Sequence, residues 1–350
     1  MITGRSSKAI NDIVRGRSGV SPDMAGCLAA AFGNTPEEWM LVDAAYRLSL
    51  ISSDTAEIEK RAGLFSRAPI REMQRRGWIK TTDEIDELEL ELGRFYDTGS
   101  AHDTKRLSVA ARRSATAPSL TPAESAWFFR AKQLAGTLLA APFSEERLPK
   151  AKSELRRLAS HPKEARHLGK LLAEYGIRFV VVEPLTGIRT DGAALWDDAG
   201  PIIAMSIRHD RVDGFWFTLM HEFSHIRHGD PNSVDSGMVD AEEGILIRLA
   251  QSEVEDRADR EAASSLIPSK ELESFINRVG PLYPRDRIIQ FANRIRIHPG
   301  IIVGQLQYRK EIGYRSMRDQ LVKIRDIVTS TALTDGWGHA ISPSVIRRRR

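Results

Sequence analysis

The chain has 350 residues, a length that favours two or three domains. Of these residues 41% are hydrophobic and 28% are charged, a composition typical of a globular protein. No apolar stretch approaches the roughly 18 residues that a membrane span needs, no signal-peptide pattern opens the chain, and a single cysteine excludes a disulfide framework, so we expect a cytoplasmic protein without a membrane partner. The net charge of +4 equals the contribution of the arginines at 347–350, because the other basic and acidic residues balance at 47 each, and it therefore does not indicate a nucleic-acid partner for the whole chain.

Residues 1–48 are predicted to form three short helices joined by tight turns. Each helix begins with a serine or threonine that can cap it, and the first two end at a glycine. The starts are Ser6, Ser21 and Thr35, and the stops are Gly16 and Gly33. Within residues 1–20, four basic side chains outnumber one acidic side chain, a local excess that the whole-chain charge hides. They are Arg5, Lys8, Arg15 and Arg17, against Asp12 alone.

Residues 49–165 read as a helical connector, and the pattern changes after Gly176. Short apolar runs bounded by glycine and proline then predict strands at 177–183, 192–197 and 201–207. Helical patterns resume at 214 and continue to about 326. We therefore predict an α+β fold, in which an all-α N-terminal module and connector precede a small antiparallel sheet with helices at 166–310, and a C-terminal helix and basic tail occupy 311–350.

The run FWFTLMHEFSHIRHGD, residues 215–230, predicts a metal site on a helix. A helix over 213–229, with Asp213 as its N-cap and Gly229 as its stop, places His221 and His225 one turn apart on one face. Two imidazoles in that arrangement can share one zinc ion. Glu222 lies one position around the helix, where it can act as a base toward a water at the metal without binding the metal itself.

A third ligand is expected from EVEDRADREAASSLIP, residues 253–268. Glu255 and Asp259 are four residues apart, so a helix places both carboxylates on one face. Glu255 is the preferred ligand, and Asp259 is expected to accept a hydrogen bond from a ligand histidine and fix its tautomer. Glu253 is the rival ligand, but it lacks a matching acid one turn further on.

Two further histidines have alternative interpretations. His228 can replace one of the ligand histidines as an i+3 partner, although an exposed position at the helix end is the simpler prediction. His298, in RIHPG, either stabilises a developing oxyanion or is an ordinary loop histidine.

Residues 170–310 resemble the ImmA/IrrE family of zinc metallopeptidase-like domains. The resemblance rests on IRFVVVE, DGAALW, RVDGFWFTLMHEFSHI and EVEDRADREAASSLIP, the last with the family's Glu-x-x-Ala-Asp pattern slightly offset. It implies that His221, His225 and Glu255 bind Zn2+ and that Glu222 is the catalytic base. Because family members cleave or inactivate DNA-binding repressors, it also implies a regulator protein as the substrate.

Residues 6–48 resemble the later helices of a HigA-type, Cro/C1-like helix-turn-helix antitoxin domain, a module that occurs fused to ImmA/IrrE domains. The resemblance implies that SSKAINDIV is the recognition helix, which enters the DNA major groove as part of a homodimer. The family's domain has two helices ahead of the recognition helix, whereas this chain opens within or just after the second, so a truncated module is expected. The expected base readers and phosphate contacts are Ser6, Ser7, Lys8, Asn11, Arg15 and Arg17.

These patterns support three functions. The first is a transcriptional regulator whose zinc-dependent metallopeptidase domain cleaves or inactivates a regulator protein within a toxin–antitoxin or stress-response system. The second is a non-enzymatic HigA-like antitoxin or repressor with a structural or sensory zinc site. The third is an unrelated zinc hydrolase with a helical dimerisation arm.

Overall fold

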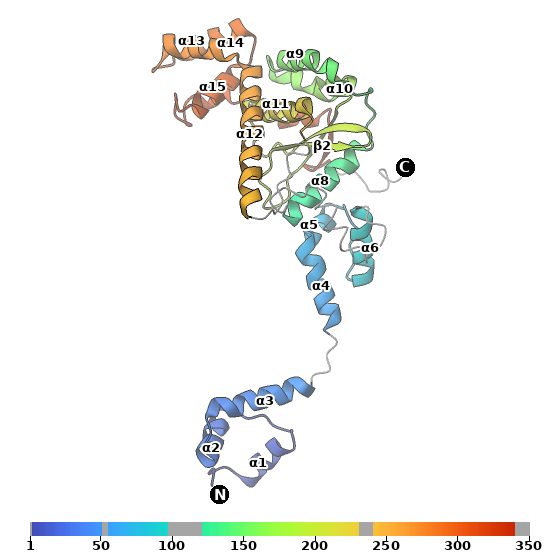
Figure 1. The fold of residues 1–350 in the computed structure, drawn as a ribbon, viewed down its shortest axis with the longest axis vertical. Helices are drawn as coiled ribbons and strands as arrows, with labels where there is room; N and C mark the ends of the chain where they lie inside the picture. Colours follow the sequence, from blue (N-terminus) through green and yellow to red (C-terminus); the bar gives the residue numbers. More distant parts are fainter. Residues whose placement is uncertain (1, 51–54, 97–120, 231–240, 340–350) are drawn as a thin grey trace. The chain divides into compact units, whose positions relative to one another are not determined.

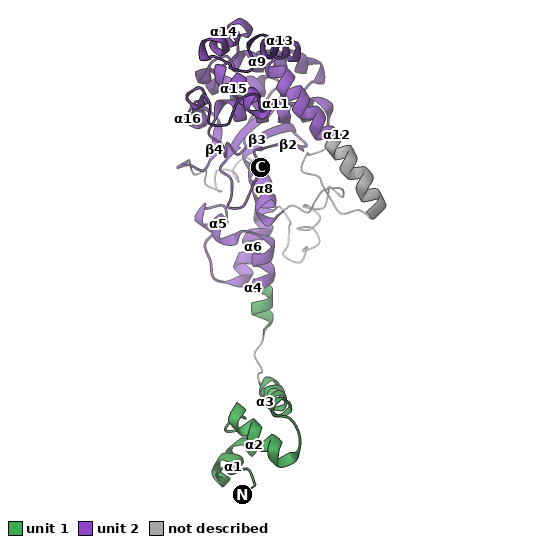
Figure 2. Ribbon diagram, turned by 90° about the vertical axis from the view of Figure 1, so that its left-hand side faces the viewer, with its two compact units in different colours: residues 1–60 green, residues 61–350 purple. Residues whose placement is uncertain are grey.

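The computed structural model describes residues 2–50, 55–96, 121–230 and 241–339, with the side chains of 241–252 left out. The chain divides into two compact units, Met1–Lys60 and Arg61–Arg350 (Figure 2). The fold is α+β, with many helices and one four-stranded sheet. Among the described helices, none combines the length and apolar character required to cross a membrane.

Unit 1 contains three short helices: α1 (Ser7–Val14), α2 (Pro22–Phe32) and α3 (Pro36–Leu50). Serine side chains cap the first two, since Ser6 Oγ accepts the Ala9 N–H and Ser21 Oγ accepts the Met24 N–H, both at 3.2 Å. A small core centred on α2 joins the three helices. Its buried members are Val20, Met24, Ala25 and Leu28, and its partly buried members are Ala9, Ile10, Ile13 and Trp39.

The sheet of unit 2 has the strand order β2–β3–β1–β4. The strands are β1 (Arg178–Val182), β2 (Gly192–Asp197), β3 (Gly200–Met205) and β4 (Leu333–Asp335). The predicted antiparallel sheet is wrong in this respect, because β1 pairs in parallel with both β3 and β4 and only β2 and β3 are antiparallel. After β1 the chain does not add the next strand, β2, beside β1. Strands β2 and β3 form an antiparallel hairpin, and its second strand, β3, pairs with β1.

Helices cover both faces of the sheet, so the side chains of β1 are buried whichever face they point to. This explains why four consecutive residues of β1, 179–182, are apolar. On one face, Phe179 and Val181 belong to a core with α9 (Leu148–Leu158), α10 (Leu168–Glu174) and α11 (Val212–His228). On the other face, Val180 and Val182 pack with α5 (Ile70–Arg75), α6 (Ile85–Phe95) and α8 (Pro122–Ala135) (Figure 1). The described residues of the predicted connector that follow residue 60 therefore belong to the same compact unit as the sheet.

The remaining described elements are mainly helices, of which α4 (Ala56–Arg67) spans the boundary between the two units. The others are η1 (Glu145–Arg147), η2 (Pro162–His167), α12 (Ala241–Leu266), α13 (Ser269–Val279), α14 (Arg285–Ile295), α15 (Pro299–Tyr308), η3 (Arg318–Gln320) and α16 (Arg325–Thr329). Helices α12 and α15 both pack against α11.

The described part of 311–350 contains the short helix α16 followed by β4, instead of one C-terminal helix. Strand β4 is tied to α8 and to the segment after α5 by Asp335, whose buried carboxylate pairs with the buried Arg130 and accepts the Trp78 indole N–H at 3.0 Å. The C-terminal segment thus completes the sheet. The predicted basic tail lies outside the described residues.

Candidate metal centre

Helix α11 positions the predicted site. Its N-cap lies two residues earlier than predicted, because Arg211, with extended backbone (φ −139°), takes that position instead of Asp213. Asp213 instead lies in the first turn and pairs with Arg211 at 2.7 Å. The helix ends as predicted at Gly229, whose φ of 63° is left-handed. Trp216, Leu219 and Phe223 anchor the helix in the core.

His221 and His225 come from successive turns of α11 and point toward the same place. Their Nε2 atoms are 3.0 Å apart, and the two rings meet edge to face with centroids 4.7 Å apart. His225 is fully buried, whereas 16% of the His221 side chain is exposed. One side of the pair is therefore sealed in the protein and the other borders solvent.

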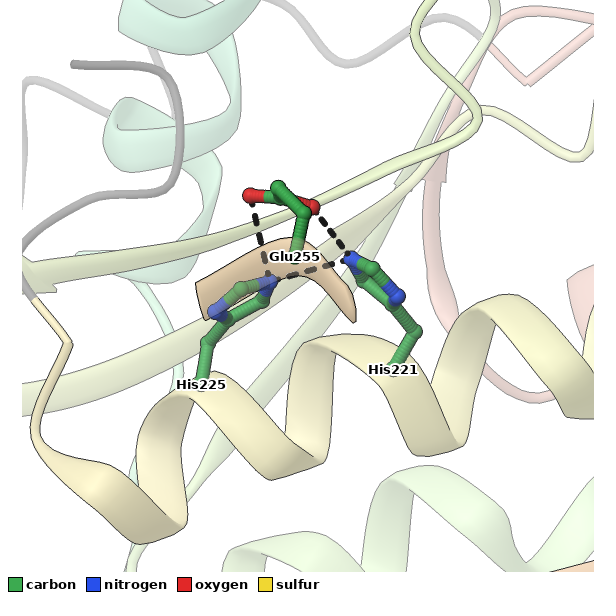
Figure 3. Close-up of side chains that lie close together, drawn as sticks. All are labelled: His221, His225 and Glu255. Carbon is green, nitrogen blue, oxygen red and sulfur yellow. Dashed lines mark hydrogen bonds and ion pairs between the residues drawn. The ribbon is translucent and has the colours of Figure 1, made fainter. Parts of the chain in front are cut away.

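Glu255 reaches this pair from α12, as the close-up in Figure 3 shows. Its Oε2 lies 3.0 Å from His221 Nε2, and its Oε1 lies 3.7 Å from His225 Nε2. One donor atom from each of the three residues falls within 4.8 Å of the others, the only such group among the described residues. Glu253, the rival ligand, is exposed and does not belong to this group.

Each histidine also contacts an acid through its other ring nitrogen. His221 Nδ1 lies 2.8 Å from Asp259 Oδ1, as expected from the sequence. His225 Nδ1 lies 3.0 Å from Asp230 Oδ2, a contact that we did not predict. The sequence signal was the position of Asp230 directly after Gly229, because a left-handed residue at a helix end turns the chain back toward the last turn. Arg257 holds both oxygens of Asp230 at 2.6 Å.

Glu222 is buried beside the triad. One bond comes from the backbone N–H of Ala194 in β2, while Oε2 has no hydrogen-bond partner among the described residues. Burial raises the pKa of Glu222 to about 7, although the two histidines act in the opposite direction. Gly192 makes the close approach of β2 possible, because a Cβ there would lie 3.0 Å from Glu222 Oε1.

The charges of the triad stabilise one another. Burial by itself lowers the pKa of His221, but the hydrogen bond with Glu255 and the charges of Glu222, Glu255 and Asp259 outweigh it and raise the pKa to about 9. Burial likewise opposes ionisation of Glu255, but hydrogen bonds with His221 and His225 prevail and lower its pKa to about 2. The carboxylate of Glu255 is therefore ionised at neutral pH.

A zinc ion fits this donor set. Two imidazole nitrogens and one carboxylate oxygen match the three protein ligands typical of catalytic zinc, which leaves one position for water or substrate. Both histidines have an acid at the second ring nitrogen, as ligand histidines commonly do. The unpartnered Glu222 oxygen supplies a buried acceptor next to the donors.

No protein-family model and no curated protein matches this chain.

The other two candidate histidines have different partners. His228 Nε2 lies 2.9 Å from Glu261, which also accepts the Ser224 hydroxyl at 3.0 Å, so this histidine helps to join α11 to α12. His298 caps α15, because its Nδ1 accepts the N–H of Gly300 at 3.1 Å.

The predicted DNA contacts lie on the surface of unit 1. Ser6 is the N-cap of α1, and Arg17 forms an ion pair with Asp12 at 2.8 Å, so these two side chains already have local partners. The six predicted residues are all exposed: Ser6, Ser7, Lys8, Asn11, Arg15 and Arg17.

Proposed function

We propose that this chain is a zinc-dependent peptidase whose protein substrate is a DNA-binding regulator. The observation that carries the proposal is the convergence of Glu255, from α12, on the two histidines of α11, with the buried carboxylate of Glu222 beside them. A histidine pair that served only the core would not need an ionised glutamate from another helix. Three donors, a neighbouring base and an open position together constitute the minimum apparatus for hydrolysis.

The hydrolytic step follows from the roles of these residues. Bound zinc would supply Lewis-acid chemistry, which polarises a carbonyl and acidifies water. Glu222 would accept a proton from the attacking water at its unpartnered Oε2. As the water oxygen bonds to the carbonyl carbon and the C–N bond breaks, Glu222 would transfer the proton to the leaving amine.

Strand β2 supports an extended peptide as the substrate. Within the described sheet it pairs only with β3, and the Ala194 N–H is directed to Glu222 instead of to that neighbour. A peptide lying along this edge would form backbone hydrogen bonds with β2 and pass directly in front of Glu222. Such binding recognises backbone more than side chains, so further contacts must select the regulator.

Unit 1 supports a regulatory role for the whole chain. The exposed side chains of Lys8 and Arg15 on and after α1 are suitable for a DNA duplex, as the resemblance to HigA-type domains implies. A chain that combines this module with the peptidase would act within a toxin–antitoxin or stress-response system, as a homodimer if it follows the symmetry of most operators.

The proposal is tested by metal content together with proteolysis. Protein from zinc-replete medium should contain about one zinc per chain, and His221→Ala should lose it. Glu222→Gln should retain zinc but lose cleavage of a co-encoded regulator. Met220→Leu, a buried substitution next to the site, is the control that should retain both. Absence of zinc from the wild-type chain contradicts the proposal.

A non-enzymatic repressor is the second candidate. It is favoured by the position of the triad across α11 and α12, where a metal would join two helices and strengthen the fold. In this case Glu222→Gln would change no phenotype, while Lys8→Gln with Arg15→Gln would abolish operator binding. The two candidates therefore differ in which variant loses function.

A further inference from the structure

A surface segment at the end of α15 gathers aromatic and basic side chains far along the chain from the predicted DNA-binding helix. We call residues 308–318 the basic–aromatic turn. It contains Tyr308 and Tyr314, which are 73% and 67% exposed and are the two most exposed of the six tyrosines. Two large rings exposed within one turn form a surface on which a planar group can stack.

Four cations share this turn, and within the described part of the chain none of them forms an ion pair. They are Arg309, Lys310, Arg315 and Arg318, all exposed. The neighbouring carboxylates are already engaged, because Glu311 accepts the Tyr283 hydroxyl at 2.5 Å and Asp319 pairs with Arg285 at 2.8 Å. The turn therefore carries four cations against one carboxylate of its own, Glu311, and its surface is positive.

The backbone of the turn is held in place. The buried side chain of Gln307 donates to the carbonyl oxygens of Tyr314 and Ser316 at 3.4 and 3.0 Å. Lys310 and Met317 have φ values of 62° and 53°, left-handed conformations that are costly for residues other than glycine. Such positions persist only where the surroundings enforce them, so the rings and cations are presented by a preorganised backbone.

The order of the side chains favours a single-stranded nucleic acid. Each exposed ring is followed directly by a cation, as Tyr308-Arg309 and as Tyr314-Arg315. In each pair the ring can stack on an unpaired base while the cation contacts the phosphate of the same strand, and the turn contains two such pairs. The bases of a duplex stack on one another, so they are not free to stack on the tyrosine rings. Ile312 and Met317 are partly buried against the core, so the exposed surface of the turn consists mainly of the rings and the cations.

We propose that the basic–aromatic turn binds single-stranded nucleic acid. This activity goes beyond the proposed peptidase, uses neither the triad nor Glu222, and lies in unit 2 instead of the helix-turn-helix-like unit.

The test is fluorescence anisotropy of the full chain with a labelled single-stranded DNA of about 20 nucleotides. Every protein carries Lys8→Gln and Arg15→Gln, which remove the contribution expected from α1. Tyr308→Ala with Tyr314→Ala should weaken binding at least about tenfold, whereas the two Tyr→Phe replacements should preserve it because the stacking ring remains. Arg309→Gln with Arg315→Gln should reduce the salt-dependence slope by about 1.4, the value for two phosphate contacts on a single strand.

The matched control is Lys163→Gln with Lys270→Gln, which removes two exposed cations elsewhere in unit 2. It should change the affinity less than about twofold. The proposal is overturned if the turn variants bind as tightly as this control. It is equally overturned if duplex DNA of the same length, or polyglutamate, competes as well as the single strand.

Discussion

The carboxylate of Asp230 lies between His225 and Arg257, 3.0 Å from the ring nitrogen of the histidine and 2.6 Å from the guanidinium. His221 has a corresponding partner in Asp259, but the two environments differ. The Asp259 side chain is 46% exposed, whereas only 12% of the Asp230 side chain is exposed.

We expect Asp230→Ala to weaken zinc binding by about 10–100-fold, and Asp259→Ala to weaken it less. Water can replace the exposed carboxylate of Asp259, whereas loss of Asp230 leaves the buried nitrogen of His225 without an acceptor. Zinc affinity is measured by competition with a chromophoric chelator, and the thermal stability of each metal-free variant serves as the control. Equal losses for the two variants would contradict the predicted asymmetry.

Gly192→Ala should impair catalysis without removing the metal. Its Cβ would lie 2.8 Å from Thr218 Cγ2 and 3.0 Å from Glu222 Oε1, so β2 must shift or the carboxylate must turn away. Displacement of a base by a fraction of an ångström should lower kcat about tenfold or more, while zinc affinity stays within about twofold. Gly214→Ala, on the helix that carries Glu222 but at a position where a Cβ would meet no atom within 4 Å, should not change catalysis. A parallel fall in zinc affinity would show that the whole of α11 had moved.

Asp335→Ala should destabilise unit 2 strongly. Removal of this carboxylate takes the counter-ion from the buried guanidinium of Arg130 and the acceptor from the Trp78 indole. We expect a loss of about 3–5 kcal/mol in the free energy of unfolding, measured by urea denaturation. Asp319→Ala, which breaks the exposed pair with Arg285, should cost less than about 1 kcal/mol. Similar costs would mean that the link from β4 to α8 is unimportant.

Asp197 provides a pH-dependent prediction. Burial by itself would raise its pKa, but hydrogen bonds from Arg178 and from the backbone N–H of Ala199 outweigh this and hold the pKa below the usual 3.8. The ionised form thus stabilises the folded state above the unfolded pKa, and this contribution is lost as the pH falls through the folded value. Asp197→Asn should therefore be less stable than wild type at neutral pH, and the difference in urea midpoint should shrink below about pH 5. A difference that is independent of pH would exclude Asp197 as its source.

Local patterns were sufficient to predict the helices of unit 1 and the two helices that carry the triad. Serine caps, the glycine stop at Gly229 and the spacing of His221 and His225 depend on neighbours within a few residues, and such interactions are encoded directly in the order of the chain. The preference for Glu255 over Glu253 also came from spacing, because the matching acid at Asp259 is one turn away.

Only the tertiary structure decided how distant segments meet. The mixed sheet, the β4 strand and the contact between Gly192 and Glu222 join residues that are tens to more than a hundred positions apart. Their pairing depends on which apolar faces pack together. Helical or strand periodicity in the sequence shows that a face is apolar, but it does not show which other face packs against it. The sequence by itself therefore determined the chemical groups of the site and their spacing along each helix. Packing of α11 against the sheet decided that Gly192 and Ala194 of β2 lie beside Glu222.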